Sequence, residues 1–146
     1  MAKMMRALQI FHGDKSRATA DHFVDYCLGA KKLNAAWIAL ADGMPAGFAV
    51  TRDWMNLVRA KPTRTLDLLY VEEKFRGCSI GTAIVSAIAA HALKQGFLRF
   101  DTSAATSNKG ANVFYKSLGF EQTKHKSNRY AIDGAAMNRL AEQKDT

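Results

Sequence analysis

One stretch of the sequence constrains the fold more than any other: a strand pattern over residues 65–71, a loop of small residues, and a helix pattern over residues 79–95. Gly96 is a typical helix stop, and residues 97–101 have a second strand pattern. A strand, a helix and a strand in this order pair the two strands in parallel through a right-handed crossover. The stretch therefore predicts a central βαβ unit.

The helix pattern of this unit, SIGTAIVSAIAAHALKQ, has apolar residues around nearly its whole circumference. Such a helix is expected to be buried between layers rather than to lie on a surface. His91 lies well inside the pattern, far from the start of the helix. We therefore expect this histidine to be a packed or exposed helix residue without a role in catalysis.

The segments on either side of the unit predict antiparallel strands and amphipathic helices. Strands are expected over residues 4–11, 34–40, 47–51, 120–123 and 128–132, and helices over residues 16–30, 108–118 and from residue 134 onward. Asp42-Gly43 is a hairpin turn signal, and Pro62 is expected in a loop. The predicted fold class is α/β, bordering on α+β: a mixed, mostly antiparallel sheet of about six to seven strands, with the central parallel βαβ unit and helices on both faces.

The length of 146 residues suits a single domain, residues 1–146, with one sizeable core. No apolar run reaches the roughly 18 residues that a membrane span needs, and the first residues lack the apolar region of a secretory signal. Cys27 and Cys78 form no CxxC or Cys/His cluster. We therefore expect a cytoplasmic domain that has free thiols, binds no metal and contacts no membrane.

The charge of the chain favours anionic partners. Lys and Arg number 21 against 13 Asp and Glu, which gives a net charge of +8. Such a balance suits a nucleic acid, a phosphorylated cofactor or an acidic surface, and does not choose among them. The basic residues are scattered, and no RNP pattern, KH loop or zinc finger occurs. A basic nucleic-acid-binding domain is therefore an alternative that rests on charge alone.

The loop before the long helix leaves a helix N-terminus that suits an anion. Such an end carries unpaired N–H groups and about half a positive charge. Gly77, Ser79 and Gly81 let a phosphate approach the backbone, and Arg76 can add a charge-assisted hydrogen bond. No GxxxxGK(S/T) or GxGxxG pattern occurs, which excludes a P-loop and a dinucleotide fingerprint. The alternative is structural: Ser79 caps the helix and the glycines shape a turn.

Two blocks of the sequence resemble the general N-acetyltransferase (GNAT) superfamily. LLYVEEKFRGCSIGTAIV, residues 68–85, is similar to the family's central motif, in which a strand leads to Arg/Gln-x-x-Gly-x-Gly/Ala at the start of a helix. SNKGANVFYKSLGFEQT, residues 107–123, is similar to the family's Asn-x-x-Ala-x-x-Phe-Tyr-x-x-x-Gly-Phe block. Ser79 stands where the family usually has glycine, and its Cβ is expected to crowd the loop if φ is positive there.

The resemblance implies an N-acetyltransferase that moves an acetyl group from acetyl-CoA to a primary amine of a small molecule or peptide. The amine would attack directly in a ternary complex, without a metal. The cofactor-binding residues that the resemblance implies are Leu69, Tyr70, Val71, Arg76, Gly77, Cys78, Ser79, Ile80, Gly81, Thr82, Asn108, Ala111 and Tyr115. Homodimers are common in the family, so one is expected here. The alternative is an acyl-CoA-binding or sensor domain without catalysis, which the departure at Ser79 supports.

The resemblance also implies two catalytic residues. Tyr115 stands at the position of the family's tyrosine that protonates the leaving thiolate, and a pKa of about 10 suits a thiol of similar basicity. Asp67 is the candidate base, because some relatives carry a glutamate on this strand. Strand alternation places Asp67 on one face with Leu69 and Val71. Deprotonation of the amine through a chain of water molecules is the alternative.

Overall fold

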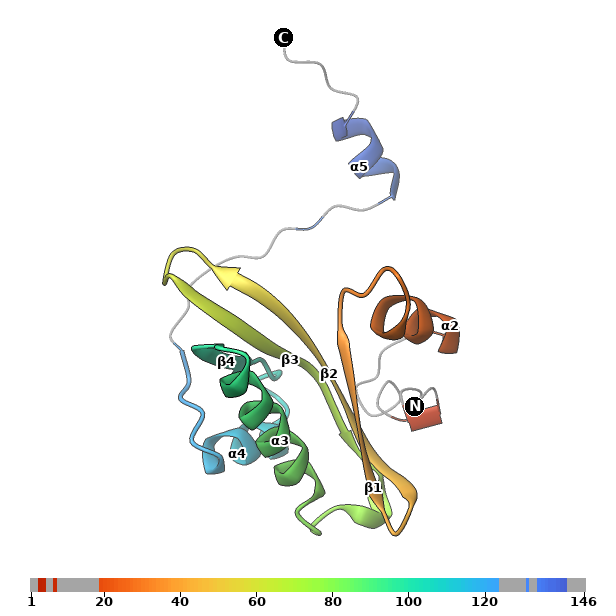
Figure 1. Ribbon diagram of the computed structural model, residues 1–146, viewed down its shortest axis with the longest axis vertical. Coiled ribbons are helices and arrows are strands. Elements are labelled where there is room, and N and C mark those ends of the chain that lie inside the picture. Colours follow the sequence, from red (N-terminus) through yellow and green to blue (C-terminus); the bar gives the residue numbers. More distant parts are fainter. Residues whose placement is uncertain (1–2, 5–6, 8–18, 124–130, 132–133, 142–146) are drawn as a thin grey trace.

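The computed structural model describes residues 3–4, 7, 19–123, 131 and 134–141 of the chain. The described residues form a four-stranded sheet with helices on both faces (Figure 1). The strands are β1 (Ala35–Ala41), β2 (Met44–Asn56), β3 (Lys61–Val71) and β4 (Arg99–Thr102). The helices are α2 (Ala20–Phe23) with its π-helical extension (Val24–Leu28), a 3₁₀ turn (Glu73–Phe75), α3 (Ile80–Lys94), α4 (Lys109–Ser117) and α5 (Gly134–Ala141). The α/β class is confirmed.

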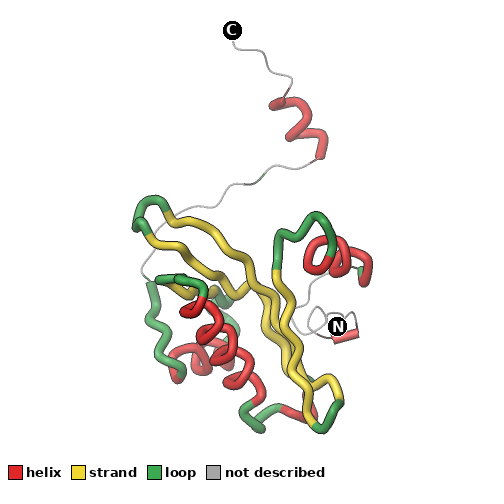
Figure 2. Tube along the Cα trace, viewed as in Figure 1, coloured by secondary structure: helices red, strands yellow, loops and turns green. Residues whose placement is uncertain are grey.

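The sheet has the order β1-β2-β3-β4, and its strands pair as the sequence predicts. β2 is antiparallel to both β1 and β3, whereas β3 and β4 are parallel and are connected through α3. Asp42 and Gly43, at φ 50° and 76°, form the hairpin turn between β1 and β2. Figure 2 shows β2 and β3 as long, twisted strands that extend beyond β1 at one end. The hairpin and the βαβ unit are confirmed.

Apolar side chains pack on both faces of the sheet. On the α2 face, the buried cluster contains Met4, Cys27, Phe48, Val50 and Tyr70. On the α3 face, the buried cluster contains Ala49, Leu66, Ile84, Val85 and Ile88, and Phe114 and Tyr115 of α4 pack against it. Successive residues of β2 thus point into opposite clusters, as strand geometry requires.

A β-bulge in β3 interrupts the side-chain alternation at Asp67. Val50 pairs with Leu68 and Thr51 pairs with Leu66, so Asp67 is an extra residue between two consecutive pairs. An extra residue of this kind breaks the period of two. As a result, Leu66 packs on the α3 face, whereas Leu68, two residues later, packs on the α2 face.

β3 and β4 separate before β3 ends. Their parallel pairing runs from Thr63 opposite Arg99 to Leu66 opposite Thr102. β3 continues to Val71, so its residues 67–71 have no ladder partner on the β4 side within the described strands. Main-chain groups along this edge are therefore available to a ligand that pairs as an added strand does.

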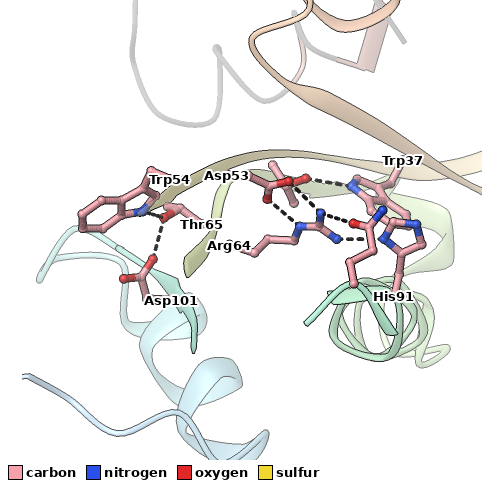
Figure 3. A network of polar contacts seen from close by, with 9 residues as sticks. Trp37, Asp53, Trp54, Arg64, Thr65, His91 and Asp101 are labelled. Carbon is pink, nitrogen blue, oxygen red and sulfur yellow. Dashed lines mark hydrogen bonds and ion pairs between the residues drawn. The ribbon is translucent and has the colours of Figure 1, made fainter. Parts of the chain in front are cut away.

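Arg64 of β3 ties α3 to the sheet through a buried polar network (Figure 3). Its Nε and Nη2 donate to the two carboxylate oxygens of Asp53, at 2.7 and 2.8 Å. Nη1 donates to His91 Nδ1 and Nη2 to Gln95 Oε1, each at 2.8 Å. The Arg64 side chain is 3% exposed, and its guanidinium lies 4.6 Å from the centroid of the Phe97 ring. His91 is thus an exposed helix residue that contacts Arg64.

The expected number of strands is wrong for the described residues. Residues 120–123 are not in a strand, and Met4 and Ala7, the described part of residues 4–11, are helical. The rest of residues 4–11, the predicted helix start at Ser16, and residues 128–132 except Ala131 lie outside the described residues. Apolar positions 4, 7, 8 and 11 fit helical spacing as well as a strand, and a short apolar run does not distinguish the two.

β3 begins at Lys61, so Pro62 lies in a strand and not in the expected loop. It pairs with Met55 close to the end of the β2–β3 hairpin, and its carbonyl accepts a hydrogen bond from Leu98 N at 3.0 Å. Proline is tolerated near the start of a strand because few ladder hydrogen bonds there need its missing N–H.

α3 buries one side only, which corrects the expectation of a helix enclosed between layers. Ile84, Val85, Ile88 and Ala92 are buried, whereas Leu93 is 74% exposed. The exposed positions of its middle turns are Ala83, Ser86, Ala87 and Ala90. Small side chains of this kind expose little apolar surface. The number of apolar residues in the helix therefore overstates how much of its surface must be covered by other elements.

Within the described part of the chain, no helix combines the length and the apolar character that crossing a membrane requires. No group of three or more His, Cys, Asp or Glu side chains among the same residues could hold a metal ion. Cys27 is buried and Cys78 is exposed, and both are free thiols, as expected.

Candidate active site

The loop from β3 to α3 forms a helix end that suits an anion. Gly77 has φ 75°, and Ser79, the N-cap of α3, has φ 61°. The Ser79 side chain makes no capping hydrogen bond, and the first turn of α3 contains no acidic residue. The first N–H groups of an α-helix have no acceptor within the helix. The start of α3 therefore presents main-chain donors and the positive end of the helix dipole.

A cavity of about 410 Å³ adjoins this helix end, and we call it the helix-end cavity. It is lined by Leu69, Val71, Phe75, Arg76, Gly77, Ser79, Ile80, Gly81, Thr82 and Phe114. Every residue from 69 to 82 that the sequence predicts as cofactor-binding lines it, except Tyr70 and Cys78. The Tyr70 ring is buried in the α2-face cluster, and Cys78 is exposed outside the cavity.

Gly81 and Arg76 both line this cavity. A Cβ at Gly81 would lie 3.3 Å from Cζ of Phe114, tighter than ordinary contact, so glycine lets α3 pack closely against α4. Arg76 Nε donates to the Val71 carbonyl at 3.1 Å, and its guanidinium lies 5.8 Å from the Tyr70 ring centroid. These contacts hold a positive charge beside the end of β3.

A second cavity, of about 180 Å³, lies where β3 and β4 separate, and we call it the gap cavity. It is lined by Asp67, Leu68, Leu69, Ser103, Ala104, Ala105, Asn108, Ala111 and Tyr115. Leu69 lines both cavities. The structure thus brings the second predicted block, Asn108 to Tyr115, to the unpaired edge of β3.

Two asparagines hold α4 in place beside the gap cavity. Asn108 Oδ1 accepts a hydrogen bond from Ala111 N at 3.1 Å, which caps the helix. Asn112 Nδ2 donates to the carbonyls of Ala105 and Asn108, at 2.8 and 2.7 Å. Because Tyr115 lies about one turn beyond Ala111, this cap also positions the tyrosine.

Tyr115 is the titratable phenol of the gap cavity. Its ring lies 5.3 Å from the Phe114 ring and 5.6 Å from the Phe120 ring, both in edge-on contact. Burial raises the pKa of Tyr115 above the ordinary value of 10.0, and a hydrogen bond with the Thr102 side chain opposes part of this shift. The phenol therefore stays protonated at neutral pH and can donate a proton within the cavity.

Asp67 lies on the α2 face, which corrects the expectation that it shares a face with Leu69 and Val71. Its Oδ1 accepts a hydrogen bond from Arg52 Nε at 3.0 Å. Arg52 points away from the α3 face, because its neighbour Asp53 points toward it. Leu69, in contrast, packs with the α3-face cluster. The bulge explains the difference, and Asp67 still lines the gap cavity.

Sequence reasoning missed Arg52 and the two aromatic walls of the helix-end cavity, Phe75 and Phe114. Phe75 directly precedes Arg76, and Phe114 is the phenylalanine of the Phe-Tyr block, so position in or beside the two motifs was the available signal. Arg52 carries no comparable signal, because the register between β2 and β3 decides which residue it meets.

A Ser79→Gly variant is expected to raise the free energy of unfolding by about 0.5–1 kcal/mol, because residues with a Cβ are strained at positive φ. Ser79 makes no capping hydrogen bond, so the variant loses none. Urea denaturation measures the change, with Ser79→Ala as the control that keeps the Cβ. A Ser79→Gly variant no more stable than Ser79→Ala would contradict the strain.

Two relatives share part of this chain. An uncharacterized N-acetyltransferase of Methanocaldococcus jannaschii is 32% identical over 87 residues, which are 59% of this chain and 38% of that protein. An aminoglycoside N(6′)-acetyltransferase type 1 of Stenotrophomonas maltophilia is 28% identical over 86 residues, which are 57% of this chain and 56% of that protein. The chain thus spans less than two thirds of the length of either relative.

Solved structures share the fold. An integron cassette protein from the mobile metagenome of V. cholerae has a TM-score of 0.76 at 23% identity, over 96% of this chain and 88% of that one. A probable acetyltransferase has a TM-score of 0.77 at 21% identity, over 91% of this chain and 90% of that one. The model of the acetyltransferase (GNAT) family matches residues 3–120. Since this match covers more than half of the chain, the protein belongs to the GNAT family.

Proposed function

We propose that this chain is an acyl-CoA-dependent N-acyltransferase that moves an acetyl group from acetyl-CoA to the primary amine of a small molecule or peptide. One observation carries the proposal: the helix-end cavity, which suits an anion, shares the wall residue Leu69 with the gap cavity, which is lined by a protonated phenol. Membership of the GNAT family supports the same activity. Relatives named aminoglycoside N(6′)-acetyltransferase, at 28% and 26% identity, support a small-molecule amine as acceptor.

The residues of the helix-end cavity fit CoA. Main-chain N–H groups at the start of α3, together with Arg76, would hold its diphosphate. Gly77 carries no Cβ and has open space at that position, so a phosphate can come close to the backbone. The unpaired edge of β3, residues 67–71, would pair with the amides of the pantetheine arm. The net charge of +8 favours the approach of this anion.

Tyr115 and Asp67 divide the proton transfers between them in this proposal. When bound, acetyl-CoA supplies a thioester carbonyl for the amine to attack. An alkylammonium with a pKa of about 10 must first lose a proton, which Asp67 accepts directly or through water. Tyr115 Oη would give its proton to the sulfur as the carbon–sulfur bond breaks, after the carbon–nitrogen bond has formed, and it would regain a proton from the nitrogen. A main-chain N–H of the β3 edge would donate to the carbonyl oxygen as negative charge develops there.

Calorimetry with acetyl-CoA and thiol release across a panel of amines test the proposal. Binding accompanied by amine-dependent thiol release supports the acyltransferase. Binding without release from any amine would instead support the non-catalytic acyl-CoA sensor, for which Ser79 is the sequence argument. A chain that does not bind acetyl-CoA would contradict both functions.

We also infer that residues 1–146 form one domain that works in the cytoplasm as a homodimer. The length of the chain and its free thiols support the first two points. Exposed apolar side chains support the dimer, notably Leu57 at 82% and Val58 at 98% exposure on the β2–β3 hairpin. Light scattering after gel filtration tests it, and a mass of 16.1 kDa, that of one chain, would contradict it.

An Arg76→Gln variant is expected to bind acetyl-CoA about tenfold more weakly, because it loses a hydrogen bond to a charged group. Calorimetric titration measures the Kd. Arg99→Gln is the matched control, since Arg99 pairs with Asp101 on β4 and lines neither cavity. An unchanged Kd for Arg76→Gln would remove this arginine from the phosphate site.

A further inference from the structure

Residues from both faces of the sheet line the gap cavity. Tyr115, on α4, lines it from the α3 face, whereas Asp67 and Leu68 belong to the α2 face. The bulge at Asp67 and the separation of β3 from β4 bring these residues to one cavity. With the cofactor on the α3 side, as proposed above, the α2 face is the side from which an acceptor would approach Tyr115.

The α2-face part of the gap cavity, at Asp67 and Leu68, is called its mouth here, and it carries paired charges. Asp67 is the charged residue of the cavity lining, and Arg52 holds it at 3.0 Å. Across β3 from Arg52, Asp101 accepts hydrogen bonds from Thr65 Oγ1 at 2.6 Å and from Arg99 Nε at 3.3 Å. Each of these two carboxylates therefore already has an arginine partner.

Such a mouth disfavours an acceptor with several positive charges. A polyamine or an aminoglycoside presents more than one ammonium group, whereas Asp67, the charged residue of the cavity lining, already pairs with the positive charge of Arg52. Like charges in contact are repulsive and act against binding. The net charge of +8 acts in the same direction at longer range.

We propose that the acceptor is an α-amino acid, or a zwitterion of the same kind, with its amine at Asp67 and its carboxylate at Arg52. Arg52 contacts Asp67 through Nε and its side chain is 50% exposed, so its terminal nitrogens can receive a second carboxylate. Opposite charges 3.0 Å apart match an amine and a carboxylate on one carbon. This assignment rests on the proposed function and makes Arg52 a specificity-determining residue.

Matched acceptors with the same side chain test the assignment. Amine-dependent thiol release from acetyl-CoA is measured with the full chain for a panel of L-amino acids, for the methyl ester of each, and for kanamycin as a polycation. The kcat/KM of the best amino acid is expected to exceed that of its ester about tenfold or more. The ester lacks the carboxylate, and a hydrogen-bonded ion pair at a half-exposed site contributes a factor of this size.

An Arg52→Gln variant is expected to remove this preference, mainly by raising KM for the amino acid. Arg52→Glu is expected to reverse it, because a glutamate repels the acceptor carboxylate but not the ester. Arg59→Gln removes an exposed arginine of the β2–β3 hairpin that lines neither cavity, and it should keep the preference. If Arg52 only supported the structure, its loss would lower the rates with acid and ester equally.

Equal kcat/KM values for acids and esters, or kanamycin acetylated better than every amino acid, would overturn this assignment and leave the proposed function standing. A preference for acids that survives in Arg52→Gln would likewise overturn the role of Arg52. Binding of acetyl-CoA without thiol release from any amine would overturn both the assignment and the proposed function.

Discussion

A Tyr115→Phe variant is expected to keep its affinity for acetyl-CoA and to lose roughly 10²- to 10⁴-fold in kcat, the usual contribution of a general acid or base. Phenylalanine keeps the ring contacts with Phe114 and Phe120, so the change removes little besides the phenolic oxygen. Steady-state thiol release gives kcat, and calorimetry gives the Kd. A variant that turns over at the rate of the natural chain would remove Tyr115 from the mechanism.

The pH dependence of the natural chain gives an independent test of the same role. Burial raises the pKa of Tyr115 above 10.0, and the protonated form is the active acid. The phenol therefore stays active below its raised pKa and loses activity only as the pH rises through that value, which lies above 10.0. The rate of thioester hydrolysis without amine is first subtracted from the measured rate at each pH. If Tyr115 causes the decline in kcat at high pH, that decline must be absent in Tyr115→Phe. A decline at the same pH in both proteins would belong to another group.

An Asp53→Ala variant is expected to lower the free energy of unfolding by about 2–4 kcal/mol, because it leaves the buried guanidinium of Arg64 without a counter-charge. Arg64 is 3% exposed, and its remaining partners, His91 and Gln95, carry no negative charge (Figure 3). Since Asp53 itself is 43% exposed, we place the loss below that of a fully buried ion pair. Urea denaturation followed by circular dichroism measures it.

Two controls separate the buried charge from a general loss of contacts. Arg99→Gln breaks an ion pair whose side chains are 26% and 27% exposed and should cost less than about 1 kcal/mol. The double variant Asp53→Ala with Arg64→Met should be more stable than Asp53→Ala alone, because it also removes the unpaired charge. If Asp53→Ala cost no more than Arg99→Gln, Arg64 would not depend on this carboxylate.

Local sequence patterns were sufficient for the βαβ unit, the Asp42-Gly43 hairpin and the helix-end loop. Turn residues with positive φ, helix stops and the spacing of apolar residues act over a few neighbours, so they can be read without knowing the partner strands. The two blocks around Arg76 and Tyr115 were also visible, and most of their residues line the two cavities. Their roles in binding and proton transfer stay predictions until the variants are measured.

By itself, the sequence determined where the central strand ends, where the long helix begins and which residues surround that junction. Only the tertiary structure decided that Asp67 faces the α2 side, that Arg52 is its partner and that Arg64 is buried beside Asp53. The physical reason is the bulge in β3: a single extra residue in the pairing of two strands changes the face of the side chains that follow. Leu66, Leu68 and Leu69 are all leucines, so their order along the chain does not indicate where the alternation breaks.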